Sequence, residues 1–275
     1  MSKKLSHDFK KMAALGEKIT MLTAYDYPTA HILEKAGIDV ILVGDSLGMV
    51  VLGYESTVPV TMEDMIHHTK AVRRGAPNTF IIADMPYLSY ATQADALQNA
   101  KRLIQEAGAD AVKLEGGDEY SSIVRFLTQA GVSVVGHIGL TPQTAAQLGG
   151  YKVQGQDIGS ATKILRDAGI LTEAGIMMLT LEAVPAELAK RITETISVPT
   201  IGIGAGVVCS GQVLVVHDLL GVYDRFVPSF VKQYENLEPR ILEAVMRYCS
   251  EVKTSTFPAQ EHSFKLHDDV KQKLF

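Results

Sequence analysis

The chain has 275 residues, of which 47% are hydrophobic and 21% charged, so it can bury a large core. Its net charge is −5 and its Lys and Arg residues form no basic stripe, which argues against nucleic acid and against an anionic membrane surface as partners. With two cysteines, no secretory signal and no apolar run near the roughly 20 residues that span a bilayer, a cytoplasmic protein is expected.

Short runs rich in Val, Ile and Leu alternate with amphipathic stretches along the chain. The runs predict strands covered on both faces, as in a parallel sheet, at 19–24, 40–46, 80–86, 111–117, 133–139, 176–182, 199–205 and 212–218. Helices are predicted between them at 27–36, 62–74, 92–107, 119–130, 157–168 and 185–196. Glycine just past a helix is a common stop signal, and the predicted helices end before Gly37, Gly75, Gly108, Gly131 and Gly169.

Eight strand–helix repeats in a chain of this length favour an α/β fold with a single closed (β/α)8 TIM barrel over an open doubly wound sheet. An open sheet is expected to carry a Gly-rich phosphate turn after its first strand, where this chain has TAYDYP. The residues before Ile19 are predicted to form a helix that covers the barrel bottom. The chain 1–275 is predicted to be one barrel domain with an extended tail from about residue 254.

Ionisable side chains stand at the ends of five predicted strands: Asp45, Asp84, Lys113 with Glu115, His137 and Glu182. Barrels of this kind place their chemistry at the carboxyl ends of the strands. Side-chain alternation puts Lys113 and Glu115 on one face, which we expect to point into the barrel mouth. The same alternation groups Asp45 with Ile41 and Val43.

Three of these carboxylates predict a cation site. Converging carboxylates repel one another and are costly to bury unless a cation lies among them. The hard oxygen ligands of Asp45, Asp84 and Glu115 suit Mg²⁺, which also takes oxygens from water and substrate.

Simpler structural roles stay open for the same residues. A lone Asp at a strand end often caps the next helix. Lys113 can be only an ion-pair partner of Glu115, and His137 can be a core histidine with satisfied hydrogen bonds. Glu182 can cap the helix that begins near Pro185.

Long segments of the sequence resemble a known family. They are LTAYDYPTA, VGDSLGMVVLGYESTVPVTMEDM, ADMPYLSY, GADAVKLEGG, GHIGLTPQ, QLGGYKVQG, LEAVPAELA and GIGAG followed by GQVLVVHDLLG. In this order, from about residue 5 to about residue 265, they are similar to ketopantoate hydroxymethyltransferase. One departure is Ser210, where the family commonly has Asp, in a loop predicted to lie at the barrel mouth.

The resemblance implies roles for seven residues. The magnesium ligands would be Asp45, Asp84 and Glu115, the substrate-binding residues Asp45, Ser46, Asp84, Lys113 and His137, and the catalytic proton acceptor Glu182. It also implies the cofactor Mg²⁺, the co-substrate 5,10-methylenetetrahydrofolate and a homodecamer of two pentameric rings.

The implied reaction transfers a hydroxymethyl group from that folate to 3-methyl-2-oxobutanoate through a magnesium-stabilised enolate. The product is ketopantoate (2-dehydropantoate), in the first step of pantothenate and coenzyme A biosynthesis. One rival is a related Mg²⁺-dependent 2-oxo-acid lyase or mutase of the phosphoenolpyruvate mutase or isocitrate lyase kind, which usually carries a Cys on a mobile loop that this sequence does not show. A non-catalytic barrel would be expected to have lost some strand-end ionisable residues, and all are present.

Overall fold

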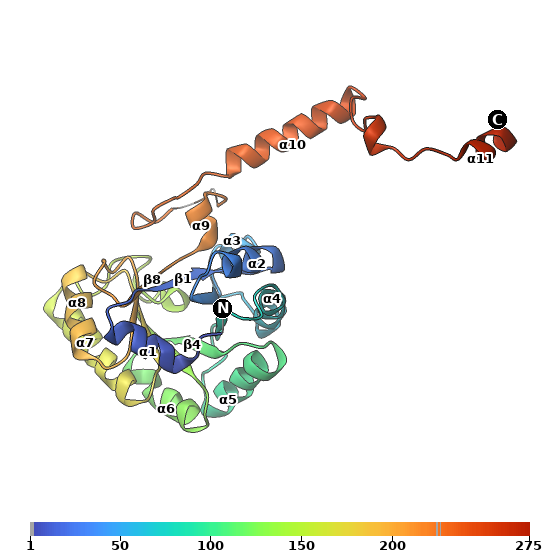
Figure 1. The fold of residues 1–275 in the computed structure, drawn as a ribbon. Helices are drawn as coiled ribbons and strands as arrows, with labels where there is room; N and C mark the ends of the chain where they lie inside the picture. The colour runs from blue at the N-terminus through green and yellow to red at the C-terminus, as the bar shows by residue number, and fades with distance from the viewer. Residues whose placement is uncertain (1–2, 224, 226) are drawn as a thin grey trace. The chain divides into compact units, whose positions relative to one another are not determined.

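The computed structural model describes residues 3–223, 225 and 227–275. Eight parallel strands close into a barrel in chain order (Figure 1). They are β1 (Ile19–Thr23), β2 (Val40–Val43), β3 (Phe80–Asp84), β4 (Ala111–Glu115), β5 (Val134–Gly139), β6 (Met178–Glu182), β7 (Thr200–Ile203) and β8 (Gly211–Leu214). Because β1 pairs with both β2 and β8, the sheet has no open edge. The predicted (β/α)8 barrel is confirmed.

Helices lie outside the strands in Figure 1. The longer ones are α2 (Tyr27–Lys35), α4 (Met62–Gly75), α5 (Gln93–Lys101), which runs on into η1 (Arg102–Glu106), α6 (Ser121–Gln129), α7 (Ile158–Glu173) and α8 (Ala186–Thr195). Short turns are α3 (Leu47–Val50), η2 (Asp118–Tyr120) and η3 (Pro142–Thr144). Gly37, Gly108 and Gly131 have φ angles of 79°, 84° and 86°. Glycine adopts this left-handed conformation without the strain that a side chain brings, so these residues are the predicted helix stops.

Helix α1 (Ser6–Ala14) packs against the core inside the barrel. Its Phe9 is fully buried and meets Phe80 of β3 edge to face, with ring centroids 5.0 Å apart. Phe9 belongs to the same apolar cluster as residues from the first halves of the strands, including Val40 and Ile82. The predicted helix over the barrel bottom is therefore confirmed.

Three local predictions were wrong. The strand predicted at 212–218 ends at Leu214, and α9 (Val216–Leu220) follows, because the Val216 N–H donates to Thr23 Oγ1 at 3.0 Å instead of continuing the ladder. The helix predicted to stop before Gly169 continues to Glu173, and Gly175, with φ 99°, follows its end. A glycine inside a helix costs only about 1 kcal/mol, which the burial of α7 outweighs.

The third correction concerns Ser210, which lies at the amino-terminal ends of the strands and not at the barrel mouth. Its carbonyl accepts a hydrogen bond from Ile19 N–H at the start of β1. Its hydroxyl accepts one from Thr200 N–H at the start of β7. The residue is thus at the opposite end of the barrel from the predicted site.

Contacts divide the chain into two compact units. The first is the barrel, up to Val216 and with Pro228–Val231, and the second comprises His217–Val227 and Lys232–Phe275. The second unit contains α10 (Glu238–Lys253), η4 (Gln260–His262) and α11 (Asp268–Leu274), the last two within the stretch predicted as an extended tail. The assignment of 1–275 to one domain stays a prediction. Within the described part of the chain, every helix is too short or too polar to cross a membrane.

Candidate active site

Polar side chains enter the carboxyl end of the barrel from four consecutive strands. They are Asp84 on β3, Lys113 and Glu115 on β4, His137 on β5 and Glu182 on β6. Their positions alternate with the same parity as the interior residues Ile82 and Ala111, so they continue the inward face upward. The sheet register also makes neighbours of Asp84 and Lys113, and of Glu115 and His137.

Lys113 lies at the centre of this cluster. Its Nζ is 3.1 Å from Asp84 Oδ1 and 4.0 Å from Glu115 Oε1, and it lies 3.2 Å from His137 Nδ1. Burial alone would lower the pKa of Lys113, but the surrounding carboxylates, Asp84 foremost, raise it above its ordinary value. The site therefore holds a permanent buried ammonium group.

His137 connects two carboxylates. Its Nδ1 lies 3.4 Å from Glu115 Oε1 and its Nε2 lies 3.2 Å from Glu182 Oε2. Burial and the Lys113 charge act to lower the pKa of His137, but its contacts with Glu115 and Glu182 raise it to about 9. His137 Nε2 is buried and lies close to Glu182 without the geometry of a hydrogen bond, so the two side chains form an ion pair when the ring is charged.

Asp45 reaches the cluster by a different route from the one predicted. The interior residues of β2 are Val40 and Leu42, so Ile41 and Val43 face the helices and alternation does not carry Asp45 inward. The chain instead turns after β2 into α3, and Asp45 N–H donates to Asp84 Oδ2 at 3.1 Å. A Cβ on Gly44 would lie 2.8 Å from Ser46 Oγ and 3.4 Å from Asp84 Oδ2, so a side chain there would displace the Ser46 hydroxyl.

Ser46 is held by a buried tyrosine. Its Oγ lies 2.8 Å from the hydroxyl of Tyr25, which is 1% exposed. The carbonyl of Tyr25 in turn contacts His68 Nδ1 at 2.6 Å. The structure thus brings all seven predicted residues to one end of the barrel and adds Tyr25 to them.

Gln143 is the main site residue that sequence reasoning missed. It is buried in η3, just after β5, and its Nε2 donates to Asp45 Oδ2 at 2.8 Å and to the Met85 carbonyl at 2.9 Å. Its Oε1 accepts from the Tyr90 hydroxyl at 2.6 Å. Its backbone N–H donates to Glu115 Oε2 at 3.0 Å. Every hydrogen-bonding group of this amide is used, so Gln143 fixes Asp45 relative to β4 and the loop after β3.

The three carboxylates predicted as metal ligands have different environments. Burial, followed by repulsion from Asp84 and Glu115, raises the pKa of Asp45 well above its ordinary value. Burial also raises the pKa of Asp84, although Lys113 opposes the change. Burial would raise the pKa of Glu115 as well, but its hydrogen bond with His137 and nearby positive charge lower it. Glu115 has both Lys113 and His137 beside it, and Asp84 has Lys113, but for both aspartates burial outweighs the nearby positive charge.

The donor set fits a divalent cation beside Asp45 and Asp84. Four carboxylates face two positive groups even with His137 protonated, so a charge of +2 would balance the cluster. Asp84 Oδ1 is buried and accepts no hydrogen bond from any described residue, although Lys113 Nζ is 3.1 Å away. Nowhere in 3–223, 225 and 227–275 do three or more His, Cys, Asp or Glu groups stand as a ready ligand set. Mg²⁺ does not require one, since it is commonly held by one or two carboxylates together with water and substrate oxygens.

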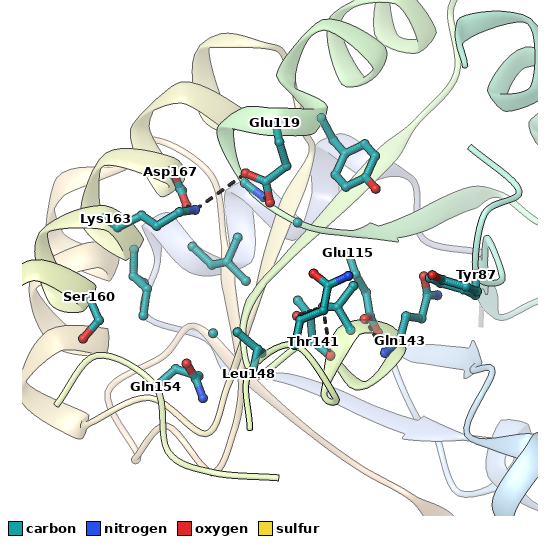
Figure 2. A pocket seen from close by; sticks show the side chains of 18 of the residues that line it. Tyr87, Glu115, Glu119, Thr141, Gln143, Leu148, Gln154, Ser160, Lys163 and Asp167 are labelled. Atoms are coloured by element: carbon teal, nitrogen blue, oxygen red, sulfur yellow. Dashed lines mark hydrogen bonds and ion pairs between the residues drawn. The ribbon is translucent and has the colours of Figure 1, made fainter. Parts of the chain in front are cut away.

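A cavity of about 430 Å³ adjoins the cluster. Figure 2 shows Gln143, Tyr87 and Glu115 on one side of it and Lys163, Asp167 and Glu119 on the other. Glu115 and Gln143 line the cavity and also contact the charged cluster, so these two residues lie between the cavity and the cluster.

Two simpler roles for the predicted residues do not describe this site. Helix α8 has Pro185 as its N-cap with no side-chain cap hydrogen bond, so Glu182 does not cap it. Helix α3 has Ser46 as its N-cap, also without a side-chain cap bond. His137 and Lys113 do find partners, but those partners are the other site residues.

Comparison with known proteins decides the family. The family model for ketopantoate hydroxymethyltransferase matches residues 3–260. The chain belongs to the ketopantoate hydroxymethyltransferase family. It is 60% identical over 258 residues to a 3-methyl-2-oxobutanoate hydroxymethyltransferase of Thermoanaerobacter sp., with 94% of each chain covered. A relative of the same name from Thermus thermophilus is 60% identical over 257 residues, covering 94% of this chain and 98% of its own.

Solved structures share the barrel at low identity. A phosphonopyruvate hydrolase complex with oxalate and Mg²⁺ has a TM-score of 0.60 at 12% identity, covering 98% of this chain and 97% of its own. A phosphoenolpyruvate phosphomutase from Streptomyces platensis has a TM-score of 0.62 at 13% identity, covering 98% and 95%. These likenesses show the fold alone, whereas the ketopantoate hydroxymethyltransferase match extends over the whole barrel. The chain is therefore a hydroxymethyltransferase, and the lyase or mutase alternative is not favoured.

Proposed function

We propose that this hydroxymethyltransferase carries a one-carbon unit from 5,10-methylenetetrahydrofolate to 3-methyl-2-oxobutanoate, giving 2-dehydropantoate in the first step of pantothenate biosynthesis. The names of the relatives at 60% identity support 3-methyl-2-oxobutanoate as the acceptor of the one-carbon unit. The observation that carries the chemistry is the buried excess of carboxylates, with Glu182 joined to it through His137. One water is consumed, and it supplies the hydroxyl oxygen of the product.

Asp45 and Asp84 are the residues that would hold Mg²⁺, and Glu115 is the third acidic residue of that site. Bound there, the cation would draw electrons from the keto carbonyl of a 2-oxo acid. The support is the pair of carboxylates whose pKa values burial raises, next to a third whose charge is already balanced.

Lys113 and Ser46 orient the acceptor. The ammonium of Lys113 adds positive charge beside the oxygen that becomes electron-rich when the C3 proton leaves. Ser46, tethered to the Tyr25 hydroxyl, offers its own hydroxyl to the substrate carboxylate. Lys113 is buried and Ser46 is half-buried, and both already contact neighbouring side chains, so they reach this geometry before substrate arrives.

Glu182 removes the C3 proton. Its side chain is 15% exposed, whereas those of Lys113, Glu115 and His137 are 3–5% exposed, so it is the carboxylate of this group most open to a ligand. His137 contacts Oε2 and leaves Oε1 to accept the proton. One water hydrolyses the two C–N bonds of the donor's methylene unit, which releases tetrahydrofolate and leaves the carbon as formaldehyde. The electron pair released at C3 then forms the new bond to that carbon, and the carbonyl oxygen takes up the proton that left C3 and becomes the product hydroxyl.

The remaining expectations concern the oligomeric state and the cellular location. We propose a homodecamer of two pentameric rings in the cytoplasm. Helix α10 supports an oligomer, because apolar side chains such as Ile241 and Met246 are 50% and 63% exposed.

A single assay tests the proposal. Purified protein is incubated with 3-methyl-2-oxobutanoate, methylenetetrahydrofolate and Mg²⁺, with and without a chelator, and ketopantoate is measured by mass spectrometry. Product should form only with both substrates and should disappear with the chelator. The matched variants are Asp84→Asn, which should be inactive, and Asp269→Asn, an exposed carboxylate of α11, which should be active. Cleavage or isomerisation of the 2-oxo acid without folate would contradict the proposal.

A further inference from the structure

The cavity of Figure 2 has the size and position of a second binding site. Its volume of about 430 Å³ lies within the range of roughly 300–1,000 Å³ that is typical of small-molecule sites. It lies between the loops that follow β4 and β5 and the first half of α7. Because Glu115 and Gln143 line the cavity and also contact the charged cluster, the cavity lies directly beside the proposed acceptor site.

A buried carboxylate at the far side of the cavity lacks part of its hydrogen bonding. Asp167 of α7 is 3% exposed, and its Oδ1 accepts no hydrogen bond from any residue that the structure describes. Its Oδ2 contacts Lys163 Nζ at 2.5 Å. A Cβ on Gly117 would collide with the same carboxylate, so glycine there allows Asp167 to come this close to the loop. An unpartnered acceptor at this depth is costly unless a ligand supplies the donor.

The charge of the lining decides which end of a folate-type donor fits. Glu115, Glu119 and Asp167 line the cavity, with Lys163 as the cationic group among its lining residues. An anionic glutamate tail would be repelled by this excess of carboxylates. The amino-pyrimidinone edge of a pterin carries two adjacent N–H donors, arranged as in a guanidinium group, and such a fork matches one carboxylate.

We propose that this cavity holds the pterin ring of the one-carbon donor, with the ring N3–H and the 2-amino group directed to Asp167 and the glutamate tail directed to solvent. The inference rests on the proposed function, whose donor it locates. Oδ2 keeps Lys163 while it accepts from the pterin, since a carboxylate oxygen takes more than one hydrogen bond. Lys163 is 53% exposed and is free to adjust.

Aromatic side chains complete the fit. Tyr90 and Tyr120 meet edge to face with centroids 5.1 Å apart, and both line the cavity. Tyr90 is also the residue that donates to Gln143, which holds Asp45. A flat ring packed here would have its methylene-bearing edge toward the acceptor, as the transfer requires.

The test measures binding of tetrahydrofolate to the full-length protein in the presence of Mg²⁺ and 3-methyl-2-oxobutanoate by titration calorimetry. Asp167→Asn keeps the shape of the side chain but replaces one acceptor with a donor, and it should weaken binding roughly 10- to 100-fold. Glu173→Gln, which changes an exposed carboxylate on the same helix, should leave binding unchanged. The second ligand is the 2-desamino-2-methyl analogue of tetrahydrofolate, which lacks one donor of the fork.

The wild-type protein should prefer tetrahydrofolate to this analogue by roughly 10- to 100-fold, and Asp167→Asn should lose most of that preference. Equal binding of the two ligands by the wild-type protein would overturn the proposal without any variant. An unchanged preference in Asp167→Asn would also overturn it. Deuterium exchange at C3 of 3-methyl-2-oxobutanoate, measured without folate, distinguishes failure of the pterin site from failure of the proposed function. Exchange that persists in Asp167→Asn supports the proposed acceptor site. If the wild-type protein showed no exchange, the proposed function itself would be refuted.

Discussion

Replacing Gln143 with Leu tests how the hydrogen-bond network holds Asp45. The substitution leaves two buried acceptors, Asp45 Oδ2 and the Met85 carbonyl, without their shared donor. The Tyr90 hydroxyl loses its 2.6 Å acceptor but keeps a weaker one, the Glu115 carbonyl at 3.3 Å. Each orphaned acceptor costs about 1–3 kcal/mol, and the apolar burial of Leu returns about 1–2 kcal/mol. We expect the free energy of unfolding to fall by about 3 kcal/mol.

The same change should weaken the cation site. Residues that orient metal ligands typically contribute about 10- to 100-fold to metal affinity, so the Mg²⁺ concentration for half-maximal activity should rise by that factor. A double-mutant cycle with Tyr90→Phe isolates the network, because the tyrosine hydroxyl is worth less once Gln143 is gone. We expect a coupling of about 1 kcal/mol in urea denaturation. Additive stabilities together with unchanged Mg²⁺ dependence would refute the assignment of Gln143 as the support of Asp45.

Three further predictions follow from the charged cluster. Asp84→Ala should abolish Mg²⁺-dependent activity while the circular dichroism spectrum stays that of the wild type, and normal turnover would refute the metal assignment. Glu182→Gln should still bind 3-methyl-2-oxobutanoate but lose C3 deuterium exchange by about 10²- to 10⁴-fold, and unchanged exchange by NMR would assign the base elsewhere. The raised pKa of His137, about 9 against an ordinary 6.5, contributes stability that is complete below pH 6.5 and is lost as the pH rises through 9. Urea denaturation of metal-free protein should therefore show a decline on the order of 1–3 kcal/mol between pH 7 and 10 that His137→Gln lacks.

Most of the barrel could be predicted because its strands are buried on both faces. Runs such as those of β2 and β3 are nearly continuous in apolar residues, and the Ala-Gly pairs that end in Gly37, Gly108 and Gly131 mark helix ends. The errors came where tertiary contacts override local pattern. Val216 continues an apolar run, yet its N–H donates to the Thr23 side chain and the strand ends.

The site was predictable where charge interrupts an apolar strand and unpredictable where it does not. Lys113 and Glu115 stand out on β4, and alternation places them correctly. Gln143 is uncharged and lies in the short turn η3 after β5, so no charge or apolar pattern in the sequence predicts its four hydrogen bonds. Asp167 did leave a signal, since it is three residues after Ile164 and four before Leu171 and so lies on the buried stripe of α7. A charge on an apolar helical face calls for a partner, which only the fold identifies.

The magnesium site is tested most directly by a crystal structure of the protein with Mg²⁺ and 3-methyl-2-oxobutanoate. We expect one cation bound by the carboxylates of Asp45 and Asp84 and by two oxygens of the 2-oxo acid, with C3 facing Glu182. A 2-oxo acid bound elsewhere, with no cation between these two aspartates, would contradict it.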